Sequence, residues 1–268
     1  MVKKAIIPAA GYGTRSLPVT KVIPKEMFPI GAKPAIQYIV EEAFASGIEE
    51  LLIIVSRAKN LIVDYFDRSL ELEAFLERQN KAHLLKDEFI PPGRLYYTRQ
   101  PYARGLGDAI RLGKSFVGSE PFAVLLPDDI VLHDGVPAIR QLIEHYERSG
   151  KSVVGLNRVK PEELHKYGVI RGKPLADGTY RIDDMVEKPK ADPPSDLAVI
   201  GRYVFTPAIF SHLEALPSSG EEEIQLTEAI RRLAAKEGCE GKIIAGERFD
   251  IGTSDGYIAL LSAVWKEK

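Results

Sequence analysis

Short apolar runs recur through the first half of the chain and alternate with longer segments that mix apolar and charged residues. Unbroken runs of this kind are typical of strands buried on both faces of a sheet. They predict strands at Ala5–Ala9, Leu51–Ser56, Arg94–Thr98 and Phe122–Leu126. The intervening segments predict helices at Pro34–Gly47, Arg57–Gln79, Gly107–Lys114 and Val136–Ser149. Because alternating strands and helices form parallel strands with right-handed crossovers, we expect a parallel sheet with a ligand site at the carboxyl ends of its strands.

After Gly150 the pattern changes to more closely spaced strands with polar turns between them. Strands are predicted at Ser152–Arg158, Gly168–Gly172, Tyr180–Glu187 and Ala198–Phe205. Helices are predicted at Glu223–Ala235 and Ser254–Trp265. The whole pattern predicts an α/β fold with three layers, α/β/α and Rossmann-like, around a mostly parallel central sheet and with a β-rich second half. We expect a single domain, residues 1–268, whose halves are residues 1–150 and 151–268.

Composition narrows the classes of partner. The 268 residues include 36 Lys and Arg against 38 Asp and Glu, so no excess of charge points to a nucleic acid or a membrane surface. No apolar run approaches the ~20 residues that a membrane span needs. The single cysteine, Cys239, excludes an intrachain disulfide, and the chain enters a strand without a leader pattern. We therefore expect a cytoplasmic protein, with Cys239 a bystander in a turn at a helix end.

A rigid, cationic loop follows the first predicted strand, in the segment IIPAAGYGTRSLPVTKVIPKEMFPI (residues 6–30). A dinucleotide-binding turn would need a third glycine where Ser16 stands. Pro18 also prevents the helix whose N-terminus would receive a pyrophosphate. An NAD-dependent enzyme is therefore disfavoured, and no phosphate-binding loop of the G-x-x-x-x-G-K-[ST] type occurs in the chain.

The glycines and cations of this loop suit a different anion. Gly11 and Gly13 would let backbone N–H groups approach a ligand without an intervening Cβ atom. Arg15 offers a planar fork for two phosphate oxygens, and Lys25 offers a compact point charge. A polyanion such as a triphosphate would fit both. The alternative interpretation is a tight turn that carries two solvated surface cations.

Carboxylates follow strands elsewhere in the chain. The fourth predicted strand ends in LPDD, so Asp128 and Asp129 emerge at the same sheet edge as the loop, and Asp250 follows another short strand pattern. Neighbouring side chains on a strand point to opposite faces, so we expect Asp128 and Asp129 to differ in role. One or two carboxylates with substrate oxygens suit Mg²⁺. The alternatives are a turn or helix N-cap for Asp128 and Asp129, and an Asx turn for Asp250.

Further polar residues stand at predicted strand ends. Gln100 carries both a donor and an acceptor and so can read the edge of a base. Glu187 and Lys188 precede a rigid proline at another strand end. The five histidines show no paired spacing, so the sequence gives no support to a histidine-based nucleophile or metal site.

Taken together, these segments resemble the sugar-1-phosphate nucleotidylyltransferases, most closely their bacterial uridylyltransferase branch. The segments are PAAGYGTR (8–15), PKEM (24–27), KPAIQYIVEEAFASGI (33–48), FDRSLELEAFLE (66–77), LPDD (126–129), YGVI (167–170), VEKPKA (186–191), VIGRYVF (199–205) and EIQLTEAI (223–230). The first is shared by many nucleotidyltransferases, whereas PKEM and the segments at 33–48 and 66–77 are specific to the uridylyltransferase branch. The resemblance therefore implies a nucleotidyltransferase fold with nucleotide-binding and sugar-binding halves.

The resemblance also implies roles for individual residues. The nucleotide site would consist of Ala10, Gly11, Gly13, Thr14, Arg15, Lys25, Gln100 and Gly105, the last two reading uracil. The sugar site would consist of Asp129, Gly168, Glu187 and Lys188. Catalysis would depend on Arg15, Lys25, Asp128 and Lys188, and Mg²⁺ would bind Asp128 and Asp250.

The implied reaction joins UTP and glucose 1-phosphate to give UDP-glucose and pyrophosphate, in a homo-oligomer that is a dimer or a tetramer. A phosphate oxygen of the sugar would attack the α-phosphorus in line with the departing pyrophosphate. Two alternatives stay open. One is the same chemistry with dTTP or another sugar, because one methyl group on the base is worth only ~1–3 kcal/mol in an apolar pocket. The other is a non-catalytic sugar-nucleotide sensor on the same fold.

Overall fold

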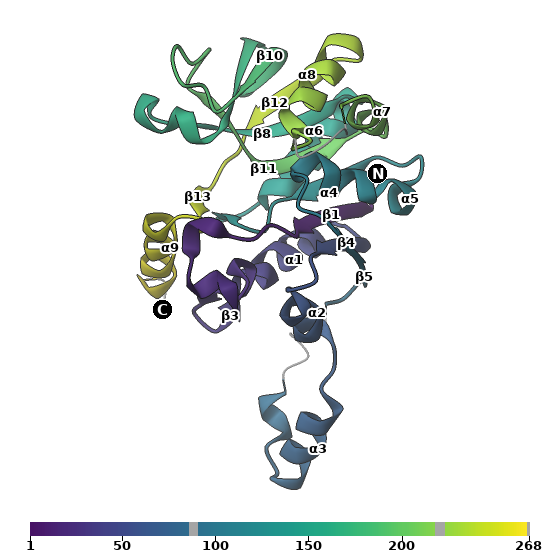
Figure 1. The fold of residues 1–268 in the computed structure, drawn as a ribbon, viewed down its shortest axis with the longest axis vertical. Coiled ribbons are helices and arrows are strands. Elements are labelled where there is room, and N and C mark those ends of the chain that lie inside the picture. The colour runs from purple at the N-terminus through teal and green to yellow at the C-terminus, as the bar shows by residue number, and fades with distance from the viewer. Residues whose placement is uncertain (86–90, 218–222, 267–268) are drawn as a thin grey trace.

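The parallel part of the sheet holds the first half of the chain together. We describe a computed structural model of the protein over residues 1–85, 91–217 and 223–266. Four strands lie side by side in the order β5 (Arg94–Arg99), β4 (Glu50–Val55), β1 (Lys4–Ala9) and β6 (Phe122–Leu125), all parallel. Each corresponds to a predicted strand. Their carboxyl ends meet at one edge, as expected (Figure 1).

The second half extends the same sheet beyond β6, to nine strands among the described residues. The added strands follow in the order β11 (Leu197–Phe205), β8 (Ser152–Arg158), β12 (Cys239–Ile243), β10 (Thr179–Glu187) and β9 (Gly168–Pro174). Only β8 and β12 pair in parallel here, and the other pairs are antiparallel. The sheet as a whole is therefore mixed rather than mostly parallel, because antiparallel strands make up most of the second half.

Helices cover both faces of the sheet, which confirms the three-layer prediction. Side chains alternate along β1, where Ala5 and Ile7 face one core cluster and Ile6 faces the other. The first cluster packs under α1 (Ala35–Ala45), α2 (Asn60–Phe66) and α6 (Ala138–Ser149). The second packs under α4 (Leu106–Leu112), α7 (Ala208–Glu214) and α8 (Leu226–Lys236). Strands that bury both faces explain the unbroken apolar runs in the sequence.

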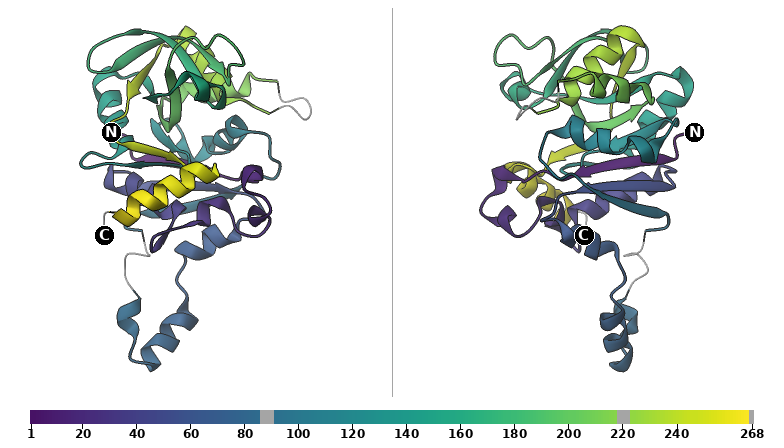
Figure 2. Two further views of the ribbon diagram at one scale, coloured as in Figure 1. Left: turned by 90° about the vertical axis from the view of Figure 1, so that its left-hand side faces the viewer. Right: turned by 45° about the vertical axis from the view of Figure 1, so that its right-hand side comes forward.

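Helix boundaries follow the proline and glycine signals where the sequence carries them. Pro34 precedes α1 and Pro137 precedes α6, while Gly150 ends α6 with a left-handed φ of 68°. The segment at 57–79 does not form one helix. It divides into α2 and α3 (Leu70–Arg78), and α3 lies on a projection away from the sheet (Figures 1 and 2). None of the α3 residues is buried.

Several short elements were not predicted. They are β2 (Pro29–Ile30), β3 (Lys33–Pro34), α5 (Lys114–Val117), β7 (Asp129–Leu132), α7, β12 and the start of β13 (Glu247–Asp250). The strands β7 and β13 pair as a separate two-stranded ribbon, which α9 (Ser254–Lys266) follows. Cys239 does not lie in a turn but opens β12, where burial raises the pKa of its thiol to about 12. In the described part of the chain, no helix is long and apolar enough to cross a membrane.

Candidate active site

Two adjoining cavities open beside the carboxyl ends of β1 and β6. The smaller cavity, of about 380 Å³, lies against the opening loop and the segment around Gln100. The larger cavity, of about 500 Å³, lies toward β9, β10 and β13. Four residues line both cavities, namely Leu106, Leu126, Asp128 and Glu223. Asp128 thus stands at the boundary between two spaces that are each large enough for part of a substrate.

Every predicted site residue lines one of these cavities. The smaller cavity contains Ala10, Gly11, Gly13, Thr14, Lys25, Gln100 and Gly105. The larger contains Arg15, Asp129, Gly168, Glu187, Lys188 and Asp250. One placement was not anticipated: Arg15, which the resemblance assigns to the nucleotide, points into the larger cavity. Segments separated by more than two hundred positions in sequence are thus gathered at one sheet edge.

The opening loop is shaped by its glycines and by short turns. Gly13 has φ 65°, a conformation that favours glycine, and a Cβ atom there would lie 3.0 Å from the methyl group of Thr20. The Thr20 hydroxyl donates a hydrogen bond of 2.9 Å to the Gly13 carbonyl. A Cβ atom at Gly11 would meet open space, so the backbone here faces the smaller cavity directly.

The two cations of the loop are paired with the two predicted metal ligands. The Lys25 ammonium donates a hydrogen bond to the Asp128 carboxylate. The Arg15 guanidinium lies 3.9 Å from Asp128 and 3.5 Å from Asp250. Burial by itself would lower the pKa of Lys25, but Asp128 and Glu26 raise it above its ordinary value. Lys25 is therefore a charged side chain fixed by its carboxylate partner, and it is 15% exposed. The side chain of Arg15 is 55% exposed.

Asp128 and Asp250 differ in electrostatic environment. Burial tends to raise the pKa of Asp128, but Lys25 and Arg15 lower it overall. Burial and the charge of Asp128 raise the pKa of Asp250. Two carboxylates that face a common cation and repel each other fit a divalent ion held partly by substrate oxygens. No group of three or more potential ligands occurs among the described residues, so a bound Mg²⁺ would depend on phosphate and water for its other ligands.

Asp250 also makes the Asx turn that was its alternative interpretation. Its Oδ1 accepts a hydrogen bond of 2.9 Å from the Gly252 N–H, while Oδ2 faces Arg15. A Cβ atom at Gly252 would lie 2.5 Å from the Arg15 guanidinium, so the close approach requires glycine. The turn therefore orients the carboxylate toward the cavity. The N-cap alternative for Asp128 and Asp129 is wrong, because the N-cap position of α6 is Pro137.

Asp129 turns away from Asp128, as the alternation of side chains predicts. Its Oδ1 accepts a hydrogen bond of 2.5 Å from Arg248, and its Oδ2 accepts one of 2.8 Å from the Gly201 N–H. Both oxygens of this buried carboxylate are thus engaged by protein groups. Asp129 contributes to the larger cavity chiefly by holding Arg248 in its wall.

Arg248 is a cavity residue that the sequence analysis missed. Its guanidinium lies 4.7 Å from the centre of the Tyr167 ring, and its side chain is 11% exposed. Burial tends to lower the pKa of Arg248, but Asp129 raises it well above its ordinary value. Residues two apart on a strand share a face, so the position of Arg248 relative to Asp250 was the signal that could have revealed it.

The far wall of the larger cavity comes from β9 and β10. Gly168 and Glu187 are directly paired across these strands. The Glu187 carboxylate accepts a hydrogen bond of 2.5 Å from the Thr227 hydroxyl and lies 3.5 Å from the Lys188 ammonium. Lys188 has φ 46° and its N–H donates to the Tyr167 carbonyl at 3.0 Å. Its side chain is 63% exposed, so packing encloses little of this cation.

A buried ion pair lies at the wall of the smaller cavity, which Glu26 lines. Glu26, next to Lys25, accepts hydrogen bonds of 2.7 Å at both carboxylate oxygens from the Lys59 ammonium. The two side chains are 1% and 6% exposed. Burial lowers the pKa of Lys59, and Glu26 offsets part of this effect. The charges alternate from Asp250 through Arg15, Asp128, Lys25 and Glu26 to Lys59, so each cation of the site faces a carboxylate.

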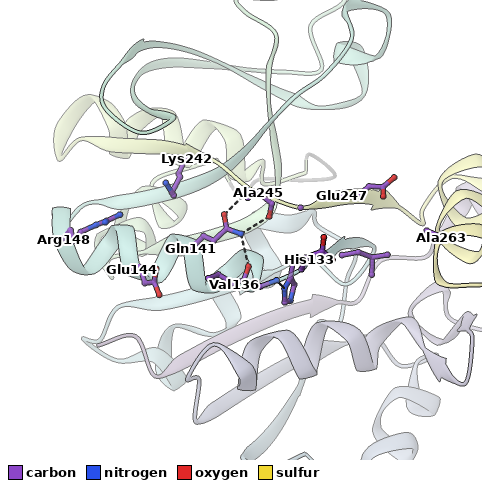
Figure 3. A pocket seen from close by; sticks show the side chains of 13 residues that line it. His133, Val136, Gln141, Glu144, Arg148, Lys242, Ala245, Glu247 and Ala263 are labelled. Carbon is purple, nitrogen blue, oxygen red and sulfur yellow. Dashed lines mark hydrogen bonds between the residues drawn. The ribbon is translucent and has the colours of Figure 1, made fainter. Parts of the chain in front are cut away.

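A further cavity, of about 670 Å³, lies apart from these residues (Figure 3). It is bounded by α6 and by the ends of β7 and β13. The Gln141 amide beside it already donates to the Val136 and Ala245 carbonyls and accepts from the Ala245 N–H. None of the predicted site residues lines this cavity. Size alone therefore does not mark the functional site, whereas the converging charges at the sheet edge do.

The chain matches known proteins over nearly its full length. A family profile described as nucleotidyl transferase matches residues 4–267. A UTP–glucose-1-phosphate uridylyltransferase of Staphylococcus epidermidis is 48% identical over 96% of this chain and 90% of that protein. A Bacillus subtilis protein, whose name assigns the same activity provisionally, is 58% identical over 97% of this chain and 96% of that protein.

A solved structure agrees with these relatives. A UDP-glucose pyrophosphorylase in complex with UDP-glucose superposes with a TM-score of 0.88 at 44% identity, covering 100% of both chains. The resemblance inferred from the sequence is therefore confirmed. The chain belongs to the nucleotidyl transferase family, in the branch of the UTP–glucose-1-phosphate uridylyltransferases.

Proposed function

We propose that the protein transfers a uridylyl group from UTP to glucose 1-phosphate, giving UDP-glucose and pyrophosphate. The observation that carries the proposal is the meeting of two cavities at Asp128, with Arg15, Lys25 and Asp250 around it. One cavity is lined by glycine backbone and a buried amide, and the other by several long charged side chains. That division suits a nucleotide on one side and a sugar phosphate on the other. The names of the relatives support the same pair of substrates.

The smaller cavity would take the nucleotide. Ala10, Gly11, Gly13 and Thr14 would place backbone N–H groups against its phosphates, because no side chain intervenes at the glycines. Lys25 would bind a phosphate oxygen in place of Asp128. Gln100 and Gly105 would meet the uracil ring. Gly105 has φ 88°, and a Cβ atom there would lie 3.0 Å from the Ile224 carbonyl, so the close packing of this corner needs glycine.

Asp128 and Asp250 would hold Mg²⁺. Both carboxylates lie near the Arg15 guanidinium, and a phosphate-bound cation could take its place between them. Such an ion would supply positive charge to the triphosphate oxygens. In that state Lys25 would exchange Asp128 for a phosphate oxygen, and Arg15 would be released to meet the charge that develops on the triphosphate during transfer. The alternating charges of the site would thus become contacts to a polyanion and a cation that enter together.

The larger cavity would take glucose 1-phosphate. Gly168 and Glu187 would contact sugar hydroxyls, and Lys188 would bind the phosphate. Arg248, held by Asp129 and Tyr167, adds a fixed positive charge in the same wall. We therefore assign Asp129 an indirect part on the sugar side, through Arg248.

The chemistry would require positioning and charge more than proton transfer. A phosphate monoester is largely ionised at neutral pH, so its oxygen can attack the α-phosphorus without a general base. The obstacle is the approach of two polyanions and the charge that develops on the departing pyrophosphate. Arg15 lines the larger cavity 3.9 Å from Asp128, the residue at the boundary, and is placed to meet that developing charge.

The test is pyrophosphate release from purified protein with glucose 1-phosphate and Mg²⁺, compared across UTP, dTTP, CTP, ATP and GTP. Release with UTP far above the others is the expected result. Comparable release with dTTP would move the assignment toward a thymidylyl or relaxed enzyme. Absence of release from folded protein that binds UDP-glucose would overturn the catalytic proposal in favour of a sugar-nucleotide sensor. Omitting Mg²⁺, or replacing it with Ca²⁺, tests the metal requirement separately.

A further inference from the structure

One buried amide in the wall of the smaller cavity has its two ends in different environments. A glutamine side chain has a donor end and an acceptor end of nearly equal size. The side chain of Gln100 lines the smaller cavity, and the residue is 6% exposed. Its backbone N–H is fixed to the Val55 carbonyl of β4 at 2.9 Å. The backbone is therefore held at this position, and the orientation of the terminal amide decides which of its two ends faces a given neighbour.

Two acceptors hold the nitrogen end of that amide. The Gln100 Nε2 donates a hydrogen bond of 2.9 Å to the Asp108 carboxylate and one of 3.3 Å to the Gly105 carbonyl. Neither group can donate. A rotated amide would place Oε1 against both acceptors and lose both bonds. These bonds favour one orientation, in which Nε2 is engaged and Oε1 accepts no hydrogen bond from a described residue.

Asp108 is itself fixed in place. It lies in the first turn of α4, is 5% exposed, and its second oxygen accepts a hydrogen bond of 2.7 Å from Arg111. A buried carboxylate with a charged partner one helical turn away is a rigid acceptor. Asp108 does not line the smaller cavity. It therefore contacts Gln100 and would not contact a ligand in that cavity.

We propose that Asp108 is a specificity-determining residue that makes the site select uracil over cytosine by fixing the acceptor end of Gln100 toward the base. The proposal rests on the nucleotide site proposed above. Uracil carries an N–H at N3, which an acceptor can receive, whereas cytosine has a lone pair at N3. Thymine shares the N3–H of uracil, so this device discriminates against cytosine without separating UTP from dTTP.

Asp108→Asn tests the proposal, because asparagine keeps the shape but offers a donor that lets the Gln100 amide rotate. The ratio of kcat/KM for UTP over CTP should fall about tenfold or more, as expected for one misdirected buried hydrogen bond. The ratio for UTP over dTTP and the KM for glucose 1-phosphate should stay within about twofold. Equal losses with UTP and CTP would reduce Asp108 to a structural residue and overturn the proposal.

Binding of uridine and cytidine 5′-monophosphates, measured by calorimetry without sugar, gives a readout that does not depend on turnover. Wild-type protein should prefer the uridine compound, and Asp108→Asn should lose that preference. The same preference in a protein that shows no pyrophosphate release would retain the Asp108 proposal while overturning the catalytic one. In a Gln100→Ala background, Asp108→Asn should have no further effect on the preference. If Asp108→Asn does not fold, Asp108→Ser replaces it, and the same loss of preference for the uridine compound is expected. An unchanged preference in Asp108→Ser would overturn the proposal.

Discussion

The two cavities differ in how far their polar groups are fixed before any ligand arrives. Around the smaller cavity, Lys25 is bound to Asp128, Gln100 to Asp108, and Glu26 to the buried Lys59. Around the larger cavity, Arg15 and Lys188 are 55% and 63% exposed at their side chains. The other polar groups described there are held more closely, Arg248 by Asp129 and Tyr167 and Glu187 by Thr227.

This contrast indicates a division of labour within one site. A base and a triphosphate are recognised by shape and by directed hydrogen bonds, which a rigid wall provides at low entropic cost. A sugar phosphate that must approach another polyanion can be met by exposed cations, which have room to adjust on binding. We therefore expect losses on the nucleotide side to affect folding and UTP together, and losses on the sugar side to affect one substrate or turnover alone.

Lys59→Met should give the largest effect and tests the rigid side directly. Removing one partner of a buried ion pair leaves Glu26 charged and unpaired, which should lower the free energy of unfolding by about 3–5 kcal/mol. Guanidinium denaturation measures this change. The double variant Glu26→Gln with Lys59→Met should recover most of the loss, because no uncompensated charge remains. A single-variant loss below about 1 kcal/mol would mean that the pair is not needed for a rigid wall.

Arg15→Ala should come next, with a loss in kcat on the order of 10²–10³ and little change in either KM, by analogy with other preorganised charges. The reason is the position of Arg15 in the larger cavity, 3.9 Å from Asp128 at the boundary, where charge would develop during transfer. Steady-state kinetics with each substrate varied in turn measures the split. Lys21→Ala removes a cation from the same loop and is the matched control, expected to retain activity. A rise in the KM for UTP with kcat unchanged would assign Arg15 to ground-state binding.

Much of this architecture is readable from the sequence because burial leaves a pattern. The parallel strands carry unbroken apolar runs, and prolines and glycines mark the ends of α1 and α6. The strand β12, CEGKI, carries Glu240, Gly241 and Lys242 and so has no apolar run to reveal it. The break between α2 and α3 escaped prediction because the segment 57–79 is charged and amphipathic when taken as a whole, although most of its charge lies outside α2, NLIVDYF.

The site shows the same limit at the level of side chains. The opening loop, Asp128 and Asp250 could be named from local motifs and from the resemblance they carry. The partners that hold them could not, because Lys59 is 33 positions from Glu26 and Arg248 is 119 from Asp129. Pairing across such separations is set by the packing of the sheet and leaves no local pattern. Asp108 is only eight positions from Gln100, yet its role depends on which end of an amide it faces.

Lys188→Ala should give the smallest effect and tests the larger cavity, where the exposed cations lie. Its ammonium is exposed, and among the described residues it pairs with Glu187 alone, so its removal should leave folding unchanged and raise the KM for glucose 1-phosphate about tenfold. The KM for UTP should change much less, because the smaller cavity does not include Lys188. Lys190→Ala removes an exposed cation from the same segment and is the control. Equal increases in both KM values would mean that the two cavities do not bind the two substrates separately. The contrast between a fixed smaller cavity and a larger cavity with exposed cations would then have to be abandoned.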